Sequence, residues 1–266
     1  MYTIQNYVKV KSLEEAYELN QKKTSKIIGG GMWVRLGKRN IGTAIDLSDL
    51  GLDKIEETED AFIIGCMTSL RDIECHEGLN SYFHGMMSEV MKGIVGTQFR
   101  NTATIGGSIF QRFGFSDPLT AFLALDTTVE LYHGGLVSLD DYVSMKYDRD
   151  ILVRIHIKKD GRKAAYQSFR NTKTDFPVLA VAVSECDSQW KVAIGARPMR
   201  AKLAEIDGLL GEYPDETAIE AFALKASESV SYQSNMRASA EYRKVLAEVL
   251  VGRAVKDILA QKAEQE

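Results

Sequence analysis

Two segments in the first half of the chain carry residue types that could bind a phosphate group. The first is the run Gly29-Gly30-Gly31, which follows a short apolar strand expected at residues 26–28. Glycine tolerates positive φ and has no Cβ, so backbone N–H groups at such a run can approach an anion closely. The run lacks the third glycine of a G-x-G-x-x-G fingerprint, because Val34 stands there, and no Gly-Lys-Ser/Thr sequence follows it. Taken alone, it is typical of a phosphate-binding loop or of a structural turn.

The second segment offers hydroxyl groups, paired glycines and an arginine within one stretch, which reads RNTATIGGS from Arg100 to Ser108. A carboxylate, Asp117, follows at short range, and such a set could bind a diphosphate and a ribose together. Two glycine segments and one acid therefore suit a dinucleotide. Asp117 has an alternative role, because with Ser116 it could cap the helix that Pro118 begins.

The chain around these residues is expected to alternate between short strands and helices. The opening predicts a small β-α-β unit with strands at 3–8, 26–28 and 43–47, a helix introduced by the capping box Ser12-x-x-Glu15, and a first helical turn at 32–36. The next hundred residues predict a helix from Ser69 capped by Thr68, a helix over 80–92, a loop over 93–108, a helix at Pro118, and strands at 127–133 and 151–157.

The last hundred residues are expected to form a separate α+β unit. Strands at 164–169, 178–184 and 190–196 predict a three-stranded antiparallel sheet, with helices after it. In the final helix, apolar residues recur at three- and four-residue steps, which predicts one buried face. That face comprises Tyr242, Val245, Leu246, Val249, Leu250, Ile258 and Leu259.

Composition and charge narrow the classes of function. The 266 residues carry a net charge of −4, and the basic residues do not gather into one block, so nucleic acid is not an expected partner. No apolar run reaches the roughly 20 residues that span a bilayer, and the first residues do not resemble a signal peptide, so a cytoplasmic protein that does not enter a membrane is expected.

Cysteine and histidine usage bears on metal and redox centres. The three cysteines, Cys66, Cys75 and Cys186, are expected to be thiols, and they are too few and too scattered to hold an iron–sulfur cluster. Any such cluster is expected on a partner. The four histidines have no metal-ligand spacing, so no metal site is expected in this chain.

Four motifs, in order along the chain, resemble the FAD subunit or domain of the xanthine dehydrogenase and carbon monoxide dehydrogenase family. The longest resemblance joins the family pattern R-N-x-A-T-I-G-G-N-I, followed by D-x-x-P-x-L-L-A-L-D-A-x-V, to the stretch RNTATIGGSIFQRFGFSDPLTAFLALDTTVEL. The family patterns A-G-G-T-D-L-L-V-x-M, V-A-L-G-A-V-A-P-R-P-x-R-A and S-x-x-Y-R-x-x-L-A-x-V-L-V-x-R-A are similar to IIGGGMWVRL, VAIGARPMRA and SAEYRKVLAEVLVGRA. Together these motifs cover the chain from about residue 3 to 260.

The resemblance implies an α+β fold in three parts. Two subdomains, at residues 1–54 and 55–160, would form an FAD-binding fold of the vanillyl-alcohol-oxidase/PCMH-like type. A small C-terminal α+β domain, with the three-stranded antiparallel sheet and its helices, would occupy residues 161–266.

Carried over position by position, the resemblance assigns cofactor-binding roles. The first pyrophosphate loop would comprise Ile28, Gly29, Gly30, Gly31, Met32 and Trp33, and the second would comprise Thr104, Ile105, Gly106, Gly107 and Ser108. Asp117 takes the place of the acid that holds the adenosine part of FAD, and Leu152 that of an aliphatic residue beside the isoalloxazine ring. Ile94 and Gln167 fall where some members carry an aromatic residue and a flavin-contacting lysine.

The chain departs from the family pattern at several of these positions. Gly31-Met32 replaces Thr-Asp, Ser108 replaces asparagine, and FQRFGF replaces a run of small residues before Asp117. The spacing to Asp117 is kept, so FAD binding is still expected. The bulky Phe110, Phe113 and Phe115 are expected to alter access to the flavin, and Gln167 is expected to alter its potential, because it lacks the charge of lysine.

The resemblance further implies an electron-transfer function. Substrate would be hydroxylated at a molybdopterin centre on a large partner subunit, and electrons would reach the FAD of this chain through 2Fe–2S clusters on a small partner subunit. NAD or another carrier would be the acceptor, and no side chain of this chain is assigned as a catalytic acid, base or nucleophile. Two alternatives stay open: a self-contained FAD-dependent oxidase, and an assembly module that has lost FAD.

Overall fold

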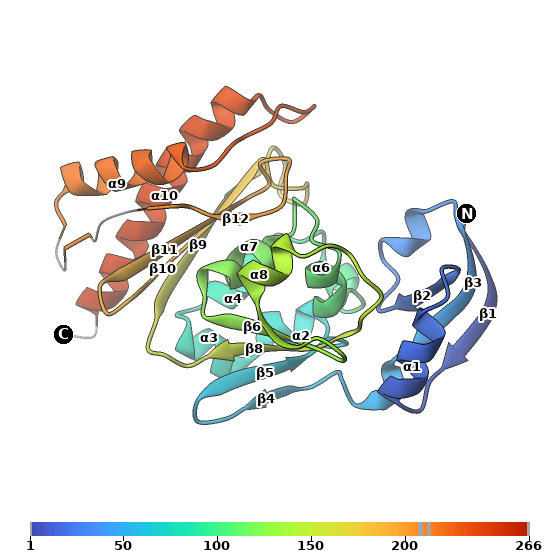
Figure 1. Cartoon of the computed structure of the whole chain (residues 1–266). Helices are drawn as coiled ribbons and strands as arrows, with labels where there is room; N and C mark the ends of the chain where they lie inside the picture. Colours follow the sequence, from blue (N-terminus) through green and yellow to red (C-terminus); the bar gives the residue numbers. More distant parts are fainter. Residues whose placement is uncertain (1, 207–209, 212–213, 265–266) are drawn as a thin grey trace.

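A computed structural model describes residues 2–206, 210–211 and 214–264. It contains three sheets, contributed in chain order by residues 3–46, 55–158 and 163–203, which we call the N-terminal, middle and C-terminal sheets. Figure 1 shows the N-terminal sheet at one side of the molecule and the C-terminal sheet at the other, with the middle sheet and its helices between them. The α+β fold class is confirmed.

The N-terminal sheet has three parallel strands in the order β1-β3-β2, that is Thr3–Lys9, Asn40–Asp46 and Ser25–Ile28. Helix α1 (Leu13–Asn20) makes the crossover between β1 and β2, and its N-cap is Ser12, as the capping box predicts. Strand β2 runs directly into the triple glycine. After it comes only the short 3-10 turn η1 (Val34–Leu36), and another, η2 (Ser48–Leu50), follows β3.

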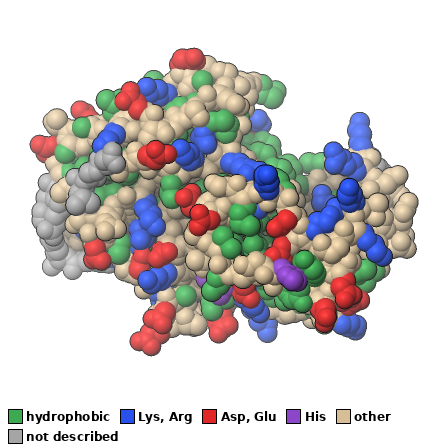
Figure 2. Space-filling model, in the orientation of Figure 1, with side chains coloured by type: hydrophobic (Ala, Val, Ile, Leu, Met, Phe, Trp, Pro, Cys, Tyr) green, Lys and Arg blue, Asp and Glu red, His purple; other side chains and the backbone are tan. Residues whose placement is uncertain are grey.

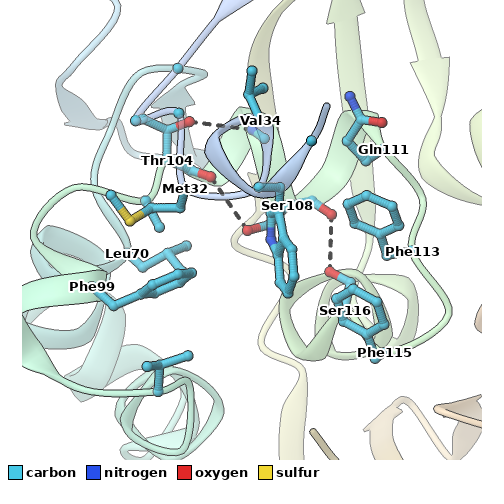
Figure 3. Close-up of a pocket in the computed structure, with 18 of the residues that line it drawn as sticks. Met32, Val34, Leu70, Phe99, Thr104, Ser108, Gln111, Phe113, Phe115 and Ser116 are labelled. Carbon is cyan, nitrogen blue, oxygen red and sulfur yellow. Dashed lines mark hydrogen bonds between the residues drawn. The ribbon is translucent and has the colours of Figure 1, made fainter. Parts of the chain in front are cut away.

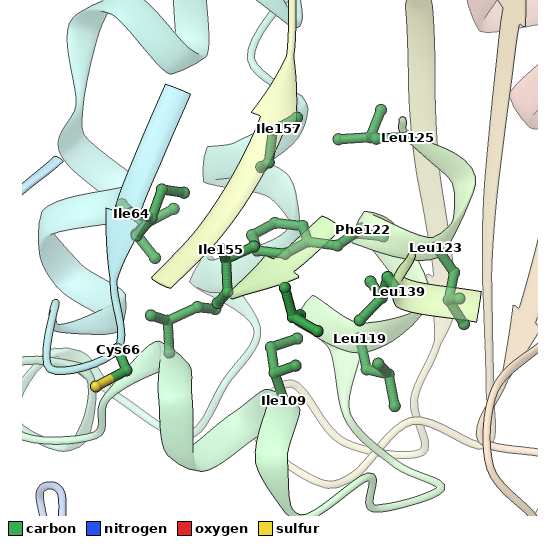
Figure 4. Close-up of a cluster of buried hydrophobic side chains, with 14 of the residues drawn as sticks. Ile64, Cys66, Ile109, Leu119, Phe122, Leu123, Leu125, Leu139, Ile155 and Ile157 are labelled. Carbon is green, nitrogen blue, oxygen red and sulfur yellow. The ribbon is translucent and has the colours of Figure 1, made fainter. Parts of the chain in front are cut away.

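The middle sheet has five antiparallel strands, in the order β4 (Ile55–Glu57), β5 (Ala61–Gly65), β8 (Leu152–Lys158), β6 (Thr127–Leu131) and β7 (Gly135–Ser138). Its helices are α2 (Leu70–Cys75), α3 (Glu77–Tyr82), α4 (Met86–Lys92), α5 (Thr97–Arg100), α6 (Ile105–Phe110), α7 (Asp117–Ala124) and α8 (Leu139–Ser144). Figure 4 shows the core between sheet and helices, where Ile155 and Ile157 of β8 face Phe122 of α7.

Three local expectations for the middle part are wrong. The helix expected over 80–92 is two helices, α3 and α4, because the chain turns between them at His84 and Gly85, which have φ of 49° and 79°. The segment 93–108, expected as a loop, contains α5 and the start of α6. The cap of α2 is Ser69 itself, whose hydroxyl accepts from the backbone N–H of Asp72.

The C-terminal sheet contains the three expected antiparallel strands, β9 (Lys163–Phe169), β10 (Leu179–Cys186) and β11 (Gln189–Gly195). A fourth strand, β12 (Lys202–Leu203), pairs with β11, so the sheet is larger than predicted. Helices α9 (Glu216–Glu228) and α10 (Ala240–Ala263) cover one face of this sheet, and α7 packs on β10 and β11 from the other (Figure 1).

Helix α7 is therefore enclosed by two sheets, and every residue from Asp117 to Ala124 is buried. This explains its mostly apolar sequence, because a helix covered on all sides needs no polar face; its two polar residues, Asp117 and Thr120, are both hydrogen-bonded. Its approach to β11 is close: a Cβ at Gly195 would lie 2.0 Å from the hydroxyl of Thr120.

The predicted buried face of α10 is only partly right. Leu250 and Ile258 are buried, but Tyr242, Val245 and Val249 are exposed by 46%, 57% and 43%. The face against the sheet instead contains small residues that let the helix approach closely. The buried residues are Arg243, Ala247, Leu250, Val251, Ala254, Val255 and Ile258. No helix in the described ranges is both long and apolar enough to span a bilayer.

Candidate functional site

A cavity of about 580 Å³ lies where the two glycine-containing segments meet. Its walls include residues 29–34 after β2, residues 103–104 and 107–108 around the start of α6, residues 113 and 115–118 at the start of α7, and residues 174–176. Figure 3 shows side chains from these segments pointing toward a shared space, with Phe99 on one side and Phe113 and Phe115 on the other. The chain thus brings its separate predicted phosphate segments to one place.

The two segments touch each other through glycines. A Cβ at Gly30 would lie 1.6 Å from the carbonyl oxygen of Thr102, and a Cβ at Gly29 would lie 2.4 Å from the hydroxyl of Thr104. Only glycine permits so close an approach, to backbone at Gly30 and to a side chain at Gly29. Of the three glycines, Gly31 alone has positive φ, at 66°. The run is therefore needed for a close approach at two positions and for a turn at the third.

The first segment has open backbone donors at the cavity wall. The N–H groups of Gly30, Gly31, Met32 and Trp33 make no hydrogen bond to the part of the chain that the structure describes. Consecutive unpaired N–H groups in a turn form a concave site for an anion such as a phosphate oxygen. The open donors therefore favour a phosphate-binding loop over a purely structural turn, the two alternatives that the sequence left open.

The second segment differs, because the N–H groups of residues 105–108 already have partners. Ile105 donates to Thr68 O at 2.9 Å, Gly106 donates to Cys66 O at 2.9 Å, and Gly107 donates to the hydroxyl of Thr104 at 3.3 Å. Gly106 is itself packed against Cys66, whose carbonyl oxygen would be 2.5 Å from an added Cβ. The second segment thus packs against the first and limits its conformation, while the first contains the consecutive open donors.

A buried ion pair fixes the chain just before the second segment. Arg100 makes two bonds to Glu74, from Nε to Oε2 at 2.7 Å and from Nη2 to Oε1 at 3.0 Å. Its third nitrogen donates to the carbonyl oxygen of Ile94 at 3.1 Å. Burial raises the pKa of Glu74, but hydrogen bonds from Arg100 and Arg71 outweigh it, so the net pKa lies below the ordinary value of 4.5.

We expect Glu74→Gln to lower the free energy of unfolding by about 2 kcal/mol at pH 7, because Arg100 loses its buried charged partner. A carboxyl with a lowered folded-state pKa stabilises the fold above its unfolded-state pKa, and this contribution is lost as the pH falls through the folded-state value. The difference between the two proteins should therefore shrink below about pH 4.5. Urea denaturation across that range measures it. The exposed Glu89→Gln serves as control, and equal destabilisation by both changes would contradict the prediction.

Asp117 lies on the cavity wall and is almost fully buried. Its Oδ1 accepts from Nη2 of Arg170 at 2.7 Å and from the hydroxyl of Tyr166. Burial raises the pKa of the Asp117 carboxyl, while Arg170 and Tyr166 oppose that rise. Burial also raises the pKa of Tyr166 far above its ordinary value, so its hydroxyl keeps the proton that it donates. The helix cap is Ser116, whose hydroxyl accepts from Leu119 N, so Asp117 is free of that role.

Positive charge surrounds the outer part of the cavity. Residues 19–45 contain six lysines and arginines and no acidic residue. The basic residues among the cavity's walls there are Lys23, Lys26, Lys38 and Arg39. Figure 2 shows Lys and Arg side chains gathered on the N-terminal part of the molecule. This local block, which would attract an anionic ligand, corrects the expectation that the basic residues do not gather.

The predicted site residues divide into two groups. Those on the cavity wall are Gly29, Gly30, Gly31, Met32, Trp33, Ile94, Thr104, Gly107, Ser108 and Asp117. Those outside it are Ile28, Ile105, Gly106, Leu152 and Gln167. Leu152 is buried in the core, and Gln167 donates to Asp257 of α10 at 2.6 Å.

Two wall residues come from a segment that sequence reasoning did not single out. Arg170 binds Asp117, and Phe176 packs against Trp33. Both lie in the connection between β9 and β10, whose path no local pattern indicates. The available signal was the arginine three residues after Gln167, a position already placed near the flavin by resemblance.

Comparison with known families identifies both halves of the chain. Residues 2–158 match the model of the FAD binding domain in molybdopterin dehydrogenase, and residues 164–258 match that of the CO dehydrogenase flavoprotein C-terminal domain. The chain belongs to the molybdopterin dehydrogenase flavoprotein family. The family resemblance predicted from the four motifs is therefore confirmed.

Relatives of this flavoprotein match over nearly their whole length. The nicotine 6-hydroxylase medium subunit of Paenarthrobacter nicotinovorans is 28% identical over 94% of this chain and 95% of its own. The glyceraldehyde dehydrogenase medium chain of Sulfolobus acidocaldarius is 24% identical over 95% and 98%. The uncharacterized protein YgfM of Escherichia coli is 25% identical over 93% and 94%.

Solved structures share the fold of this flavoprotein. Carbon monoxide dehydrogenase from Hydrogenophaga pseudoflava superposes with a TM-score of 0.85 at 23% identity, covering 96% of this chain and 97% of that one. Quinoline 2-oxidoreductase from Pseudomonas putida 86 gives 0.84 at 19% identity, with 98% of each chain covered.

The residues present fit an FAD. The open donors at 30–33 suit its diphosphate, the buried carboxylate on the cavity wall suits a sugar hydroxyl, and the cavity is of the size that ligand pockets have. The departure of Gly31-Met32 from the family pattern leaves these features in place.

Proposed function

We propose that this chain binds one FAD in the cavity and passes electrons from partner iron–sulfur clusters to an acceptor, as the medium subunit of a molybdenum hydroxylase. The observation that carries the proposal is the contact of Gly29 and Gly30 with residues 102–104, beside four open backbone donors. The family membership of both parts of the chain supports the same reading.

The partners follow from the same proposal. A large subunit would hold molybdopterin and perform the hydroxylation, and a small subunit would hold 2Fe–2S clusters. The relatives described as a medium subunit and a medium chain support such an assembly. NAD or another carrier would accept the electrons, and a cytoplasmic location stays a prediction.

The chain's own contribution is binding and electrostatics. FAD, when bound, exchanges single electrons with clusters and electron pairs with a carrier such as NAD. The N–H groups of 30–33 would hold the diphosphate, and the basic side chains at the cavity's outer part would balance its charge. Asp117, with Oδ1 occupied by Arg170 and Tyr166, would accept a sugar hydroxyl at Oδ2.

The proposal is tested by expressing the chain alone and with its two partner subunits. The isolated chain should bind one FAD per molecule, and substrate turnover should require all three subunits with molybdenum and iron. Turnover of an organic substrate by the isolated flavoprotein would favour the self-contained oxidase. A folded chain with no FAD affinity, measured by equilibrium dialysis, would favour the assembly module and overturn the proposal.

We expect Asp117→Asn to weaken FAD binding about tenfold, because a hydrogen bond to a charged group contributes about 1.5–3 kcal/mol and the amide lacks the charge. Since the resemblance assigns Asp117 to the adenosine part, FMN affinity should change less than threefold. Equilibrium dialysis with both flavins measures the difference. Equal losses for FAD and FMN would contradict the assignment, and a thermal melt checks that the variant, which leaves Arg170 without its anion, remains folded.

A further inference from the structure

Five aromatic rings form one group on the cavity wall: Trp33, Phe99, Phe113, Phe115 and Phe176. Trp33 is the centre of this aromatic group, because its ring is the one that neighbours all four others. The centroid distances from Trp33 are 5.1 Å to Phe115, 5.5 Å to Phe176, 5.8 Å to Phe113 and 6.5 Å to Phe99.

The aromatic group is not part of a hydrophobic core. All five rings are half-buried, and only Phe99 packs against a core cluster. The rings come from all three parts of the chain: Trp33 follows β2, Phe113 and Phe115 precede α7, and Phe176 precedes β10. Aromatic rings bury some 150–250 Å² each when covered, so rings left open to a cavity offer a large apolar surface to a ligand.

The position of Trp33 relates this surface to the proposed cofactor. Trp33 lies within the run of open N–H donors, so a planar ring attached through a sugar to a diphosphate bound there would lie near the indole. Phe176 stacks on Trp33 at an interplanar angle of 25°. The guanidinium carbon of Arg237 lies over the Phe176 ring, 5.0 Å from its centroid. Phe113 and Phe115 stack on each other at 13°. The phenylalanines thus hold the indole in place.

We propose that Trp33 is the stacking surface for a planar ring of the bound dinucleotide, and that the aromatic group positions it. This inference rests on the proposed function and extends it. It concerns positions at which this chain differs from the family pattern, which has leucine at the position of Trp33 and small residues at those of Phe113 and Phe115. These departures from the family pattern bring Trp33, Phe113 and Phe115 together on the cavity wall, whereas Leu152 and Gln167 lie outside it.

The test uses the chain's two tryptophans. Trp190 lies in β11 beside Phe222, away from the cavity wall, so Trp190→Phe leaves Trp33 as the single indole. In that background, equilibrium dialysis measures the binding of FAD, FMN and ADP. Fluorescence then reports contact with Trp33: the emission of the indole is followed when ADP binds, and the emission of the flavin is followed when FMN binds. Contact with an indole quenches flavin emission. ADP does not absorb at the wavelengths of indole emission, so a change of that emission on ADP binding reports contact and not energy transfer.

We expect Trp33→Leu to raise the Kd of FAD at least tenfold, as removal of a base-stacking side chain does, and Trp33→Phe to stay within threefold. A change of Trp33 emission with ADP assigns the adenine ring, and FMN emission restored by Trp33→Leu assigns the isoalloxazine ring. FAD bound equally well by Trp33→Leu, with no emission change for either ligand, overturns the inference while the proposed function stands. No FAD binding by the unaltered chain overturns both. Thermal melts of the two variants separate lost stacking from unfolding.

Discussion

Gly30→Ala is expected to reduce FAD affinity at least 100-fold, about 2.7 kcal/mol at 25 °C. The added Cβ would lie 1.6 Å from the carbonyl oxygen of Thr102 and 2.5 Å from its carbonyl carbon. Both neighbours are backbone atoms, so no side-chain rotation relieves the clash and the two segments must separate. The N–H groups at 30–33 then no longer lie together at the cavity wall. Equilibrium dialysis with FAD measures the loss.

Gly96→Ala provides a matched control for that change. Gly96 is extended at φ −159°, precedes α5 and leaves an added Cβ 3.8 Å from its nearest neighbour, the side-chain oxygen of Gln98. It should keep FAD affinity within twofold. If Gly30→Ala bound FAD as well as Gly96→Ala does, the contact between the two segments would have no part in forming the site.

The glycine run shows how far a local pattern leads. Its position after a strand correctly predicts a turn, and its resemblance to a family loop correctly predicts the family. The pattern does not say that Gly29 and Gly30 serve contact while Gly31 serves positive φ. That division depends on residues 102–104, which lie some seventy positions away in the chain and carry no mark of the contact.

The second segment shows the converse limit. Its hydroxyls and glycines predict donors for a phosphate, yet the N–H groups of Ile105 and Gly106 are bonded to Thr68 and Cys66. Periodicity along one segment cannot reveal that another segment has taken its hydrogen bonds. The cavity wall from Arg170 and Phe176 is missed for the same reason, because tertiary packing alone brings it there.

The sequence located the helices better than it located their buried faces. Helix α7 was placed correctly by Pro118 and its apolar run, because burial on all sides makes register unimportant. Helix α10 has two apolar faces, and the prediction followed the one with the larger side chains, of which Tyr242, Val245 and Val249 are exposed. The sheet prefers the stripe with Ala247 and Ala254, since small residues bring the helix axis closer to it.

Arg243→Leu is expected to lower the free energy of unfolding by about 3 kcal/mol. Arg243 is fully buried on α10 and has only neutral acceptors: it donates to the carbonyl oxygens of Val178, Gln233 and Ala238 and to the amide oxygen of Asn235, at 2.6–2.9 Å. Leucine would remove the cost of burying a cation, but the carbonyl oxygens of Val178 and Gln233 would lose the donor that the guanidinium provides. The oxygens of Ala238 and Asn235 would keep the N–H groups of Asn235 and Arg237. The second effect is larger because the guanidinium joins the 233–238 segment to the buried carbonyl oxygen of Val178.

The effect should extend to the cavity, because Arg243 orders the segment that carries Arg237. Arg237 binds Asp175 at 2.8 Å and covers Phe176, so a loosened 233–238 segment releases two wall residues. Arg243→Leu should therefore melt about 10 °C lower and bind FAD more weakly, as calorimetry and dialysis would show. Arg253→Leu, on an exposed position of the same helix, should change neither by much. Equal melting of the two variants would mean that the buried guanidinium contributes no more than a surface charge does.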